Sequence, residues 1–107
     1  MRLGNQQAQG IITALDPYLS GHSASLFLYG SRVRDDLKGG DIDLLLLANT
    51  DIMVKKLRSE KHILLSQVKK YIGDQKIDIT IANYTDTTTD PFLKIIMPQA
   101  NLLHQWK

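Results

Sequence analysis

Two stretches of sequence decide the fold of this chain: Leu28-Tyr29-Gly30-Ser31-Arg32-Val33-Arg34 and Gly40-Asp41-Ile42-Asp43-Leu44-Leu45-Leu46-Leu47. In the second stretch, Asp41 and Asp43 are two positions apart, so on a β-strand both carboxylates point to the same face. The strand continues into four leucines, which places the pair at the mouth of a buried element. Because aspartate is depleted in strands and rarely buried without a partner, the pair indicates a bound cation, usually a hard divalent metal.

The first stretch has the character of a phosphate-binding turn. The apolar run 26–29 predicts a buried strand, and residues 31–37 predict a short helix or turn with Ser31 at its N-cap. Gly30 lets the backbone approach a ligand closely, while a helix N-terminus offers free N–H groups and a positive dipole end. Alone, the pattern is far more typical of an ordinary turn with a capping serine. The aspartate pair, which follows Ser31 after nine intervening residues, favours the phosphate interpretation.

A third carboxylate follows in the apolar run 76–82, which predicts another strand. Isoleucines at positions 77, 79 and 81 face one way, and Asp78 and Thr80 face the other. If this strand lies beside the second one, Asp78 falls next to Asp41 and Asp43. Clustered carboxylates without a metal raise one another's pKa; with a metal they become ligands, or Asp78 becomes a base that accepts a proton. The alternatives are a salt-bridged Asp78 and a pair of strand-entry aspartates that cap the Gly39-Gly40 turn.

The remaining elements follow from apolar periodicity. We expect a helix over 5–16 that ends near Pro17, a long helix over 52–72, a polar loop over 83–90, and a last amphipathic segment from Pro91 toward Leu103, interrupted near Pro98. The apolar stripe of the long helix consists of Met53, Leu57, Leu64, Val68 and Tyr71, and Glu60 and Lys61 interrupt it. This element order predicts an α/β fold of the α+β type, a small sheet with helices packed against it.

Composition limits the classes of protein that the chain can belong to. At 107 residues it is expected to form one domain, and without cysteine it has no disulfide, zinc-thiolate site or thiol nucleophile. No apolar run approaches a membrane span and no signal peptide is visible, so we expect a soluble, cytoplasmic protein with no membrane partner.

Some of the 13 basic residues cluster in one part of the sequence. These are Lys55, Lys56, Arg58, Lys61, Lys69 and Lys70. We interpret them as a solvated helix face. Nucleic-acid binding through this face is the alternative, and it predicts a steep salt dependence. The net charge of only +2 and the 7% aromatic content argue against nucleic acid as a partner.

Taken together, Leu28-Tyr29-Gly30-Ser31-Arg32-Val33-Arg34 and Gly40-Asp41-Ile42-Asp43-Leu44 resemble the signature of the polymerase-β-type nucleotidyltransferase superfamily. More narrowly, the chain resembles the minimal nucleotidyltransferase group of bacteria and archaea. The resemblance spans nearly the whole chain, because members of this group contain little beyond the catalytic domain.

The resemblance implies a mixed sheet of three or four strands flanked by helices, and transfer of a nucleoside monophosphate from an NTP, expected to be ATP, with two Mg²⁺ ions. The nucleotide-binding residues that it implies are Gly30, Ser31 and Arg32. The metal-binding and catalytic residues that it implies are Asp41, Asp43 and Asp78. In these roles the glycine and serine hold the triphosphate, the aspartate pair binds the metals, and Asp78 completes the metal site and helps to deprotonate the acceptor hydroxyl.

The acceptor is expected to lie outside this chain, which has little surface to spare beyond such a site. In the group that the chain resembles, the partner is often a small helical protein of the HEPN type, and the pair forms a toxin–antitoxin system in which the nucleotidyltransferase adenylylates the toxin. The alternative from a different class is a non-catalytic module that neutralises such a partner by occlusion. A homo-oligomer is left open.

Overall fold

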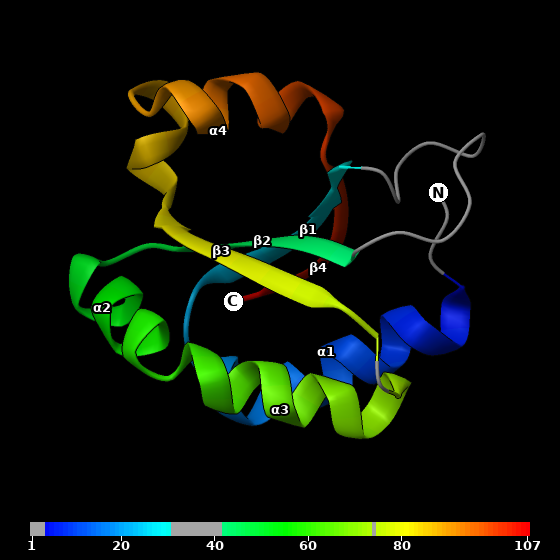
Figure 1. The fold of residues 1–107 in the computed structure, drawn as a ribbon. Helices are drawn as coiled ribbons and strands as arrows, with labels where there is room; N and C mark the ends of the chain where they lie inside the picture. The colour runs from blue at the N-terminus through cyan, green and yellow to red at the C-terminus, as the bar shows by residue number, and fades with distance from the viewer. Residues whose placement is uncertain (1–3, 31–41, 74) are drawn as a thin grey trace.

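A four-stranded mixed sheet forms the centre of the molecule in the computed structural model, which describes residues 4–30, 42–73 and 75–107 (Figure 1). The strands are β1 (Ala24–Tyr29), β2 (Ile42–Ala48), β3 (Ile77–Asn83) and β4 (Asn101–Trp106). They are arranged in the order β3-β2-β1-β4. The pair β2–β3 is parallel, whereas β1 is antiparallel to both β2 and β4. The α+β fold with a mixed sheet is therefore confirmed, with the fourth strand present.

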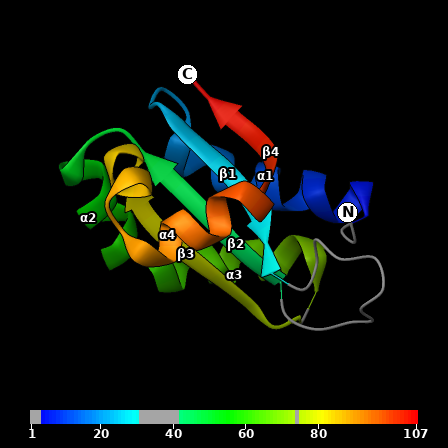
Figure 2. The same ribbon diagram turned by 90° about the horizontal axis from the view of Figure 1, so that it is seen from above.

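Helices cover the two faces of the sheet unequally. The helices α1 (Asn5–Leu19), α2 (Asp51–Ser59) and α3 (Lys61–Ile72) lie on one face, and α4 (Pro91–Ile96) lies on the other (Figures 1 and 2). None of the helices in the described part of the chain combines the length and the apolar character that crossing a membrane requires.

Two apolar clusters, one on each face, follow from the alternation of side chains along the strands. The larger cluster lies under α1, α2 and α3 and includes Leu44, Leu46 and Ile79. The smaller cluster lies under α4 and includes Leu45 and Leu47. Because β2 is a central strand covered on both faces, its leucine run is buried throughout, as expected for a strand that reads as continuously apolar.

The expected long helix over 52–72 is wrong in one respect, because the structure divides it into α2 and α3. Glu60 lies between them with φ −102° and ψ 10°, outside the helical region. The break changes the direction of the chain just where Glu60 and Lys61 interrupt the apolar stripe. Tyr71, a predicted member of that stripe, is 55% exposed and does not belong to the core.

The first helix extends further than expected. Pro17 lies inside α1, near its C-terminal end, and the helix continues to Leu19. A proline this close to the end removes one backbone hydrogen bond without preventing the last turn. The strands at 26–29, 41–48 and 76–82 are confirmed to within two residues of their predicted bounds.

The C-terminal segment differs most from the expectation. The polar loop after β3 contains a 3-10 helix, η2 (Tyr84–Thr88), and α4 is followed by another, η3 (Met97–Gln99), at the predicted interruption near Pro98. Beyond it the chain forms β4 rather than more helix. Trp106 ends this strand, and it is buried against the larger core with its indole N–H donating to Asp16 Oδ1 at 2.8 Å.

Candidate active site

The register of β2 and β3 brings two of the predicted carboxylates together. Asp43 and Asp78 are direct partners in the parallel pairing. Partners in neighbouring strands are separated by only about 4.8 Å and share a face of the sheet. Asp43 is partly exposed and Asp78 is 58% exposed in its side chain, so the pair lies at an accessible end of the sheet. The prediction that the third strand lies beside the second is confirmed.

Gly30 is held against the Asp43 carboxylate. Tyr29, the last residue of β1, is the partner of Asp43 in the antiparallel pairing, and the chain leaves the strand at Gly30 with φ +79°. A Cβ atom at position 30 would lie 3.2 Å from Asp43 Cγ and closer still to its Oδ2 atom. The position therefore needs glycine for two reasons, because the conformation is left-handed and the carboxylate fills the space of a side chain.

The side chains of Tyr29 and Thr80 lie beside the carboxylates on the same face of the sheet. Tyr29 Oη and Thr80 Oγ1 share a hydrogen bond of 3.1 Å, and the Tyr29 ring contacts Phe92 of α4 edge to face at 5.9 Å between centroids. Burial is the main cause that raises the pKa of the Tyr29 phenol above its usual value, and the charges of Asp43 and Asp78 raise that pKa further. The hydrogen bond to Thr80 and the charge of Lys61 act in the opposite direction.

Lys61 neutralises one of the carboxylates. Its ammonium Nζ lies 2.9 Å from Asp78 Oδ1. The alternative prediction, that Asp78 forms a salt bridge, is therefore confirmed. A salt-bridged Asp78 is compatible with a role in the site. Lys61, which was predicted on a solvated basic face, is 37% exposed in its side chain, and that side chain also reaches the edge of the candidate site.

Three predicted site residues lie outside the described part of the chain: Ser31, Arg32 and Asp41. The short helix or turn expected over 31–37 lies there as well. The structure therefore brings together Gly30, Asp43 and Asp78, and the roles of all six residues remain predictions from the sequence.

The donor atoms that the structure does describe fit a hard divalent cation. Two carboxylates on adjacent strands, on one accessible face, supply the oxygen ligands that Mg²⁺ prefers. Within residues 4–30, 42–73 and 75–107, no group of three or more histidine, aspartate or glutamate side chains could hold a metal ion. The predicted third carboxylate donor, Asp41, is among the residues not described.

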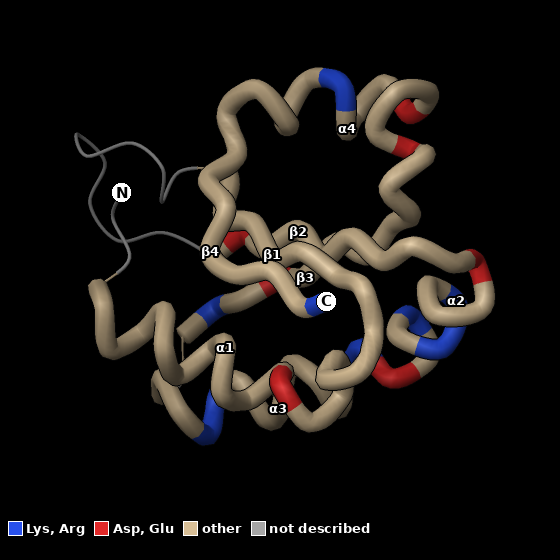
Figure 3. Tube along the Cα trace, turned by 180° about the vertical axis from the view of Figure 1, so that it is seen from behind, with Lys and Arg blue, Asp and Glu red and all other residues tan. Residues whose placement is uncertain are grey.

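The basic residues of α2 lie on an exposed face of that helix. In α2 the acidic Asp51 begins the helix and the basic residues follow it (Figure 3), and Arg58 has a structural contact: its Nε donates to the Ile81 carbonyl at 2.9 Å. Because β3 is an edge strand, this contact satisfies a backbone acceptor that faces away from the sheet. The arrangement supports the solvated-face interpretation for this part of the basic run.

Three contributors to the site were missed from the sequence, namely Tyr29, Thr80 and Lys61. Signals for two of them were present. Thr80 alternates with Asp78 on the same strand face, and Tyr29 immediately precedes the glycine of the motif. Lys61 gave only an indirect signal, as a charge that interrupts an apolar stripe.

A comparison with protein-family models identifies the family of the chain. A family model described as a nucleotidyltransferase domain matches residues 10–97, from within α1 to the end of α4. A comparison with curated proteins finds no match for the chain. The family match covers most of the sequence and contains the aspartates of β2 and β3 as well as Gly30 at the end of β1. The chain therefore belongs to the nucleotidyltransferase domain family, and its mixed α+β fold fits the core of the polymerase-β-like superfamily.

Proposed function

We propose that this protein transfers AMP from ATP to a hydroxyl group on a partner protein, with Mg²⁺ held by the aspartates at the ends of β2 and β3. The family supports nucleotidyl transfer as the activity, and the finer assignment is our proposal. The observation that carries it is the pairing of Asp43 with Asp78 in register on adjacent strands, with Gly30 packed against the Asp43 carboxylate. We also infer that residues 1–107 act as one minimal nucleotidyltransferase domain.

The donor side of the reaction follows from the chemistry of these residues. In this proposal, two bound Mg²⁺ ions supply Lewis-acid activation of the α-phosphoryl group and neutralise the leaving pyrophosphate. Asp41 and Asp43 hold the ions, and Gly30 and Ser31 bring backbone N–H groups to the triphosphate, with Arg32 adding positive charge. Asp78 completes the ligand set and accepts the proton of the attacking hydroxyl.

The acceptor is proposed to come from another polypeptide. The described site occupies one end of one sheet face, and the resemblance to minimal nucleotidyltransferases supports a small helical partner of the HEPN type in a toxin–antitoxin pair. Transfer of AMP to such a toxin adds a bulky, negatively charged group, which gives neutralisation a chemical basis.

The experiment is label transfer in a purified system. The protein is incubated with a candidate helical partner, Mg²⁺ and α-³²P-ATP, and incorporation into the partner is followed by electrophoresis. We expect transfer that depends on Mg²⁺ and falls by more than about 100-fold in Asp43→Asn, since even residues that only support a metal ligand contribute roughly 10- to 100-fold. Equal transfer by wild type and Asp43→Asn contradicts the proposal.

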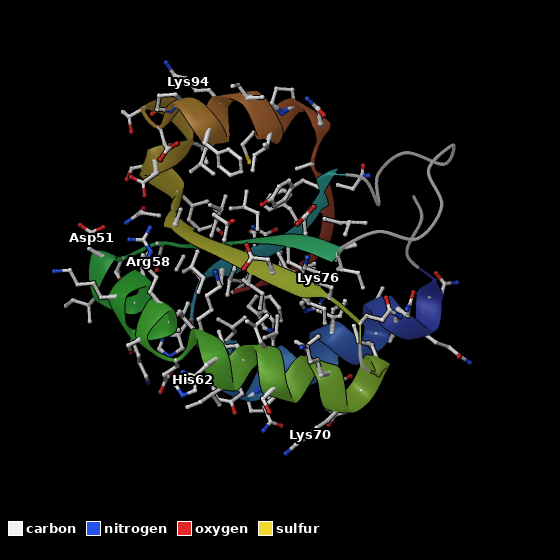
Figure 4. The ribbon with its side chains drawn as sticks, viewed as in Figure 1. Asp51, Arg58, His62, Lys70, Lys76 and Lys94 are labelled. Atoms are coloured by element: carbon white, nitrogen blue, oxygen red, sulfur yellow. The ribbon has the colours of Figure 1, made fainter. Side chains whose placement is uncertain are left out.

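The matched control is Asp51→Asn. Asp51 starts α2 at the opposite end of the sheet, where Figure 4 shows it far from the strand ends that carry the site. It accepts a hydrogen bond from Asn83 Nδ2 at 3.0 Å, and an asparagine oxygen can accept the same bond. This variant loses the same charge and should retain transfer. If Asp43→Asn loses transfer yet still neutralises the partner in cells, binding by occlusion is the operative function instead.

A further inference from the structure

The Lys61–Asp78 ion pair connects two layers of the molecule. Lys61 is the first residue of α3, which packs on the face that carries the larger core, whereas Asp78 points to the opposite face with Asp43. Because β3 is an edge strand, the lysine side chain can reach past the edge of the sheet to the carboxylate. The Nζ–Oδ1 distance of 2.9 Å and side-chain exposures of 37% and 58% describe a formed but solvent-accessible pair.

Helix formation does not explain a lysine at this position. A positive charge in the first turn of a helix opposes the helix dipole, and the first turn of α3 carries no acidic residue to offset it. The chain also breaks at Glu60 and restarts at Lys61, so that this residue begins a new helix beside β3. The ion pair with Asp78 is an electrostatic explanation for a lysine at position 61.

Lys61 supplies a positive charge to Asp78, which lies beside a second carboxylate. Asp43 and Asp78 are register partners, and like charges on neighbouring strand positions destabilise a sheet. A metal cation and the Lys61 ammonium would serve the same purpose at Asp78 and compete for the same oxygen atoms. Because the pair is partly exposed, it is weak enough to be exchanged reversibly.

We propose that Lys61 is a positioning residue of the metal site: its ammonium holds Asp78 in the metal-free protein, and a divalent cation bound by Asp43 and Asp78 displaces it. This inference rests on the proposed function, because it uses the same two carboxylates as ligands. It adds that the chain contains its own competitor for the metal, which lowers the affinity for Mg²⁺ and keeps the carboxylates in place without it.

The test is Mg²⁺ binding to the full chain, measured by calorimetric titration and by the Mg²⁺ dependence of Tm, without nucleotide or partner. Lys61→Met removes the charge and keeps most of the hydrocarbon stem. We expect it to bind Mg²⁺ about 2- to 5-fold more tightly than wild type, the range that corresponds to a partly exposed ion pair. In EDTA it should melt at a lower temperature than wild type, and saturating Mg²⁺ should remove that difference. Lys61→Arg, which keeps the charge, should behave as wild type.

Two controls separate this local effect from general charge. Lys70→Met makes the same change in charge at the other end of α3, where Figure 4 shows the side chain pointing away from the sheet. It should leave the Kd for Mg²⁺ unchanged. In an Asp78→Asn background, Lys61→Met should have no further effect on Mg²⁺ binding, because the pair no longer exists. Lys61→Gln provides a second neutral variant if Lys61→Met does not fold.

Equal Mg²⁺ affinity in wild type and Lys61→Met, or an equal shift in Lys70→Met, overturns the inference. If label transfer also persists and still requires Asp43, the proposed function survives that result. If wild type binds no Mg²⁺, or Asp78→Asn binds it as tightly as wild type, both the inference and the proposed metal site are wrong.

Discussion

The two faces of the sheet carry different kinds of residues on the same strands. On the face under α1, α2 and α3, the side chains of β2, and those of β3 as far as Ile81, are apolar and belong to the larger core. On the face under α4, the same strands change from leucine and alanine at one end to Asp43, Asp78 and Thr80 at the other. One face is fully covered, and the other is covered only in part by a six-residue helix.

Because of this difference, one face of the sheet mainly stabilises the fold, and the other carries the candidate site. Burial of apolar surface is the main source of folding free energy, and most of that surface lies on the fully covered face. The partly covered face can therefore place two carboxylates and a phenol at an accessible end of the sheet. A polar side chain on the fully covered face would have to be buried without water.

The largest expected effect is a loss of stability, and it compares the two faces of the sheet through adjacent residues of β2. Leu46 belongs to the larger cluster and Leu47 to the smaller one, and both are essentially inaccessible to solvent. We expect Leu46→Ala to lower the free energy of unfolding by about 4 kcal/mol and Leu47→Ala by about 2–3 kcal/mol, because the surroundings of Leu47 can collapse more easily. Urea unfolding followed by circular dichroism measures both. Equal losses would mean that the two faces contribute equally to stability.

A second, intermediate effect concerns the turn that adjoins the site. Gly30→Ala imposes a left-handed conformation on alanine and pushes a methyl group into the Asp43 carboxylate. Gly21→Ala is the matched control, since Gly21 has φ +86° and a Cβ atom there would meet no other atom within 4 Å. Each substitution should cost about 1–2 kcal/mol of stability for the backbone conformation. Only Gly30→Ala should lower AMP transfer, by up to about 100-fold, because catalysis is sensitive to displacements near 1 Å.

The rates of AMP transfer by Gly30→Ala and Gly21→Ala are compared at a temperature where both variants are folded. A similar loss of transfer in Gly21→Ala would attribute the effect to backbone strain. Unchanged transfer in Gly30→Ala would show that Asp43 can move away from the added methyl group without affecting the chemistry.

The smallest expected effect is a pH dependence of stability that is due to Tyr29, which lies beside the carboxylates and contacts α4. The pKa of Tyr29 is raised in the folded protein, first by burial and then by the charges of Asp43 and Asp78, with Lys61 opposing them. Above its usual pKa near 10, the unfolded chain therefore loses this proton before the folded one does. Stability should be retained below that pH and fall as the pH rises through about 10 toward the folded pKa.

Tyr29→Phe isolates this contribution. The variant lacks the hydrogen bond to Thr80, so near pH 8 it should be less stable by about 0.5–1.5 kcal/mol. The difference should shrink as the pH increases beyond about 10, because only wild type then loses stability through this phenol. Urea unfolding of both proteins between about pH 8 and 11 measures it, and a constant difference over that range would show that the Tyr29 pKa is not raised.

Local patterns in the sequence were sufficient for the strands and for the faces of their residues. The alternation Ile77-Asp78-Ile79-Thr80-Ile81 assigned the isoleucines to the core and Asp78 to the other face, as the structure confirms. The expectation that the third strand lies beside the second was also correct. The assignment of faces depends on side-chain periodicity, which is a property of the strand itself.

Long-range contacts decided what these patterns left open. The segment 101–106 has no strong strand pattern and becomes β4 because it pairs with β1 and buries Trp106. The break at Glu60 depends on how α2 and α3 pack on the sheet. The helical periodicity of the sequence contains no information about that packing. For the same reason the sequence alone determined that Asp43 and Asp78 each lie on a strand, whereas only the tertiary structure decided that they are register partners and that Lys61 forms an ion pair with Asp78. Register and ion pairing between distant segments are set by packing across the whole fold, and no local stretch of sequence contains that information.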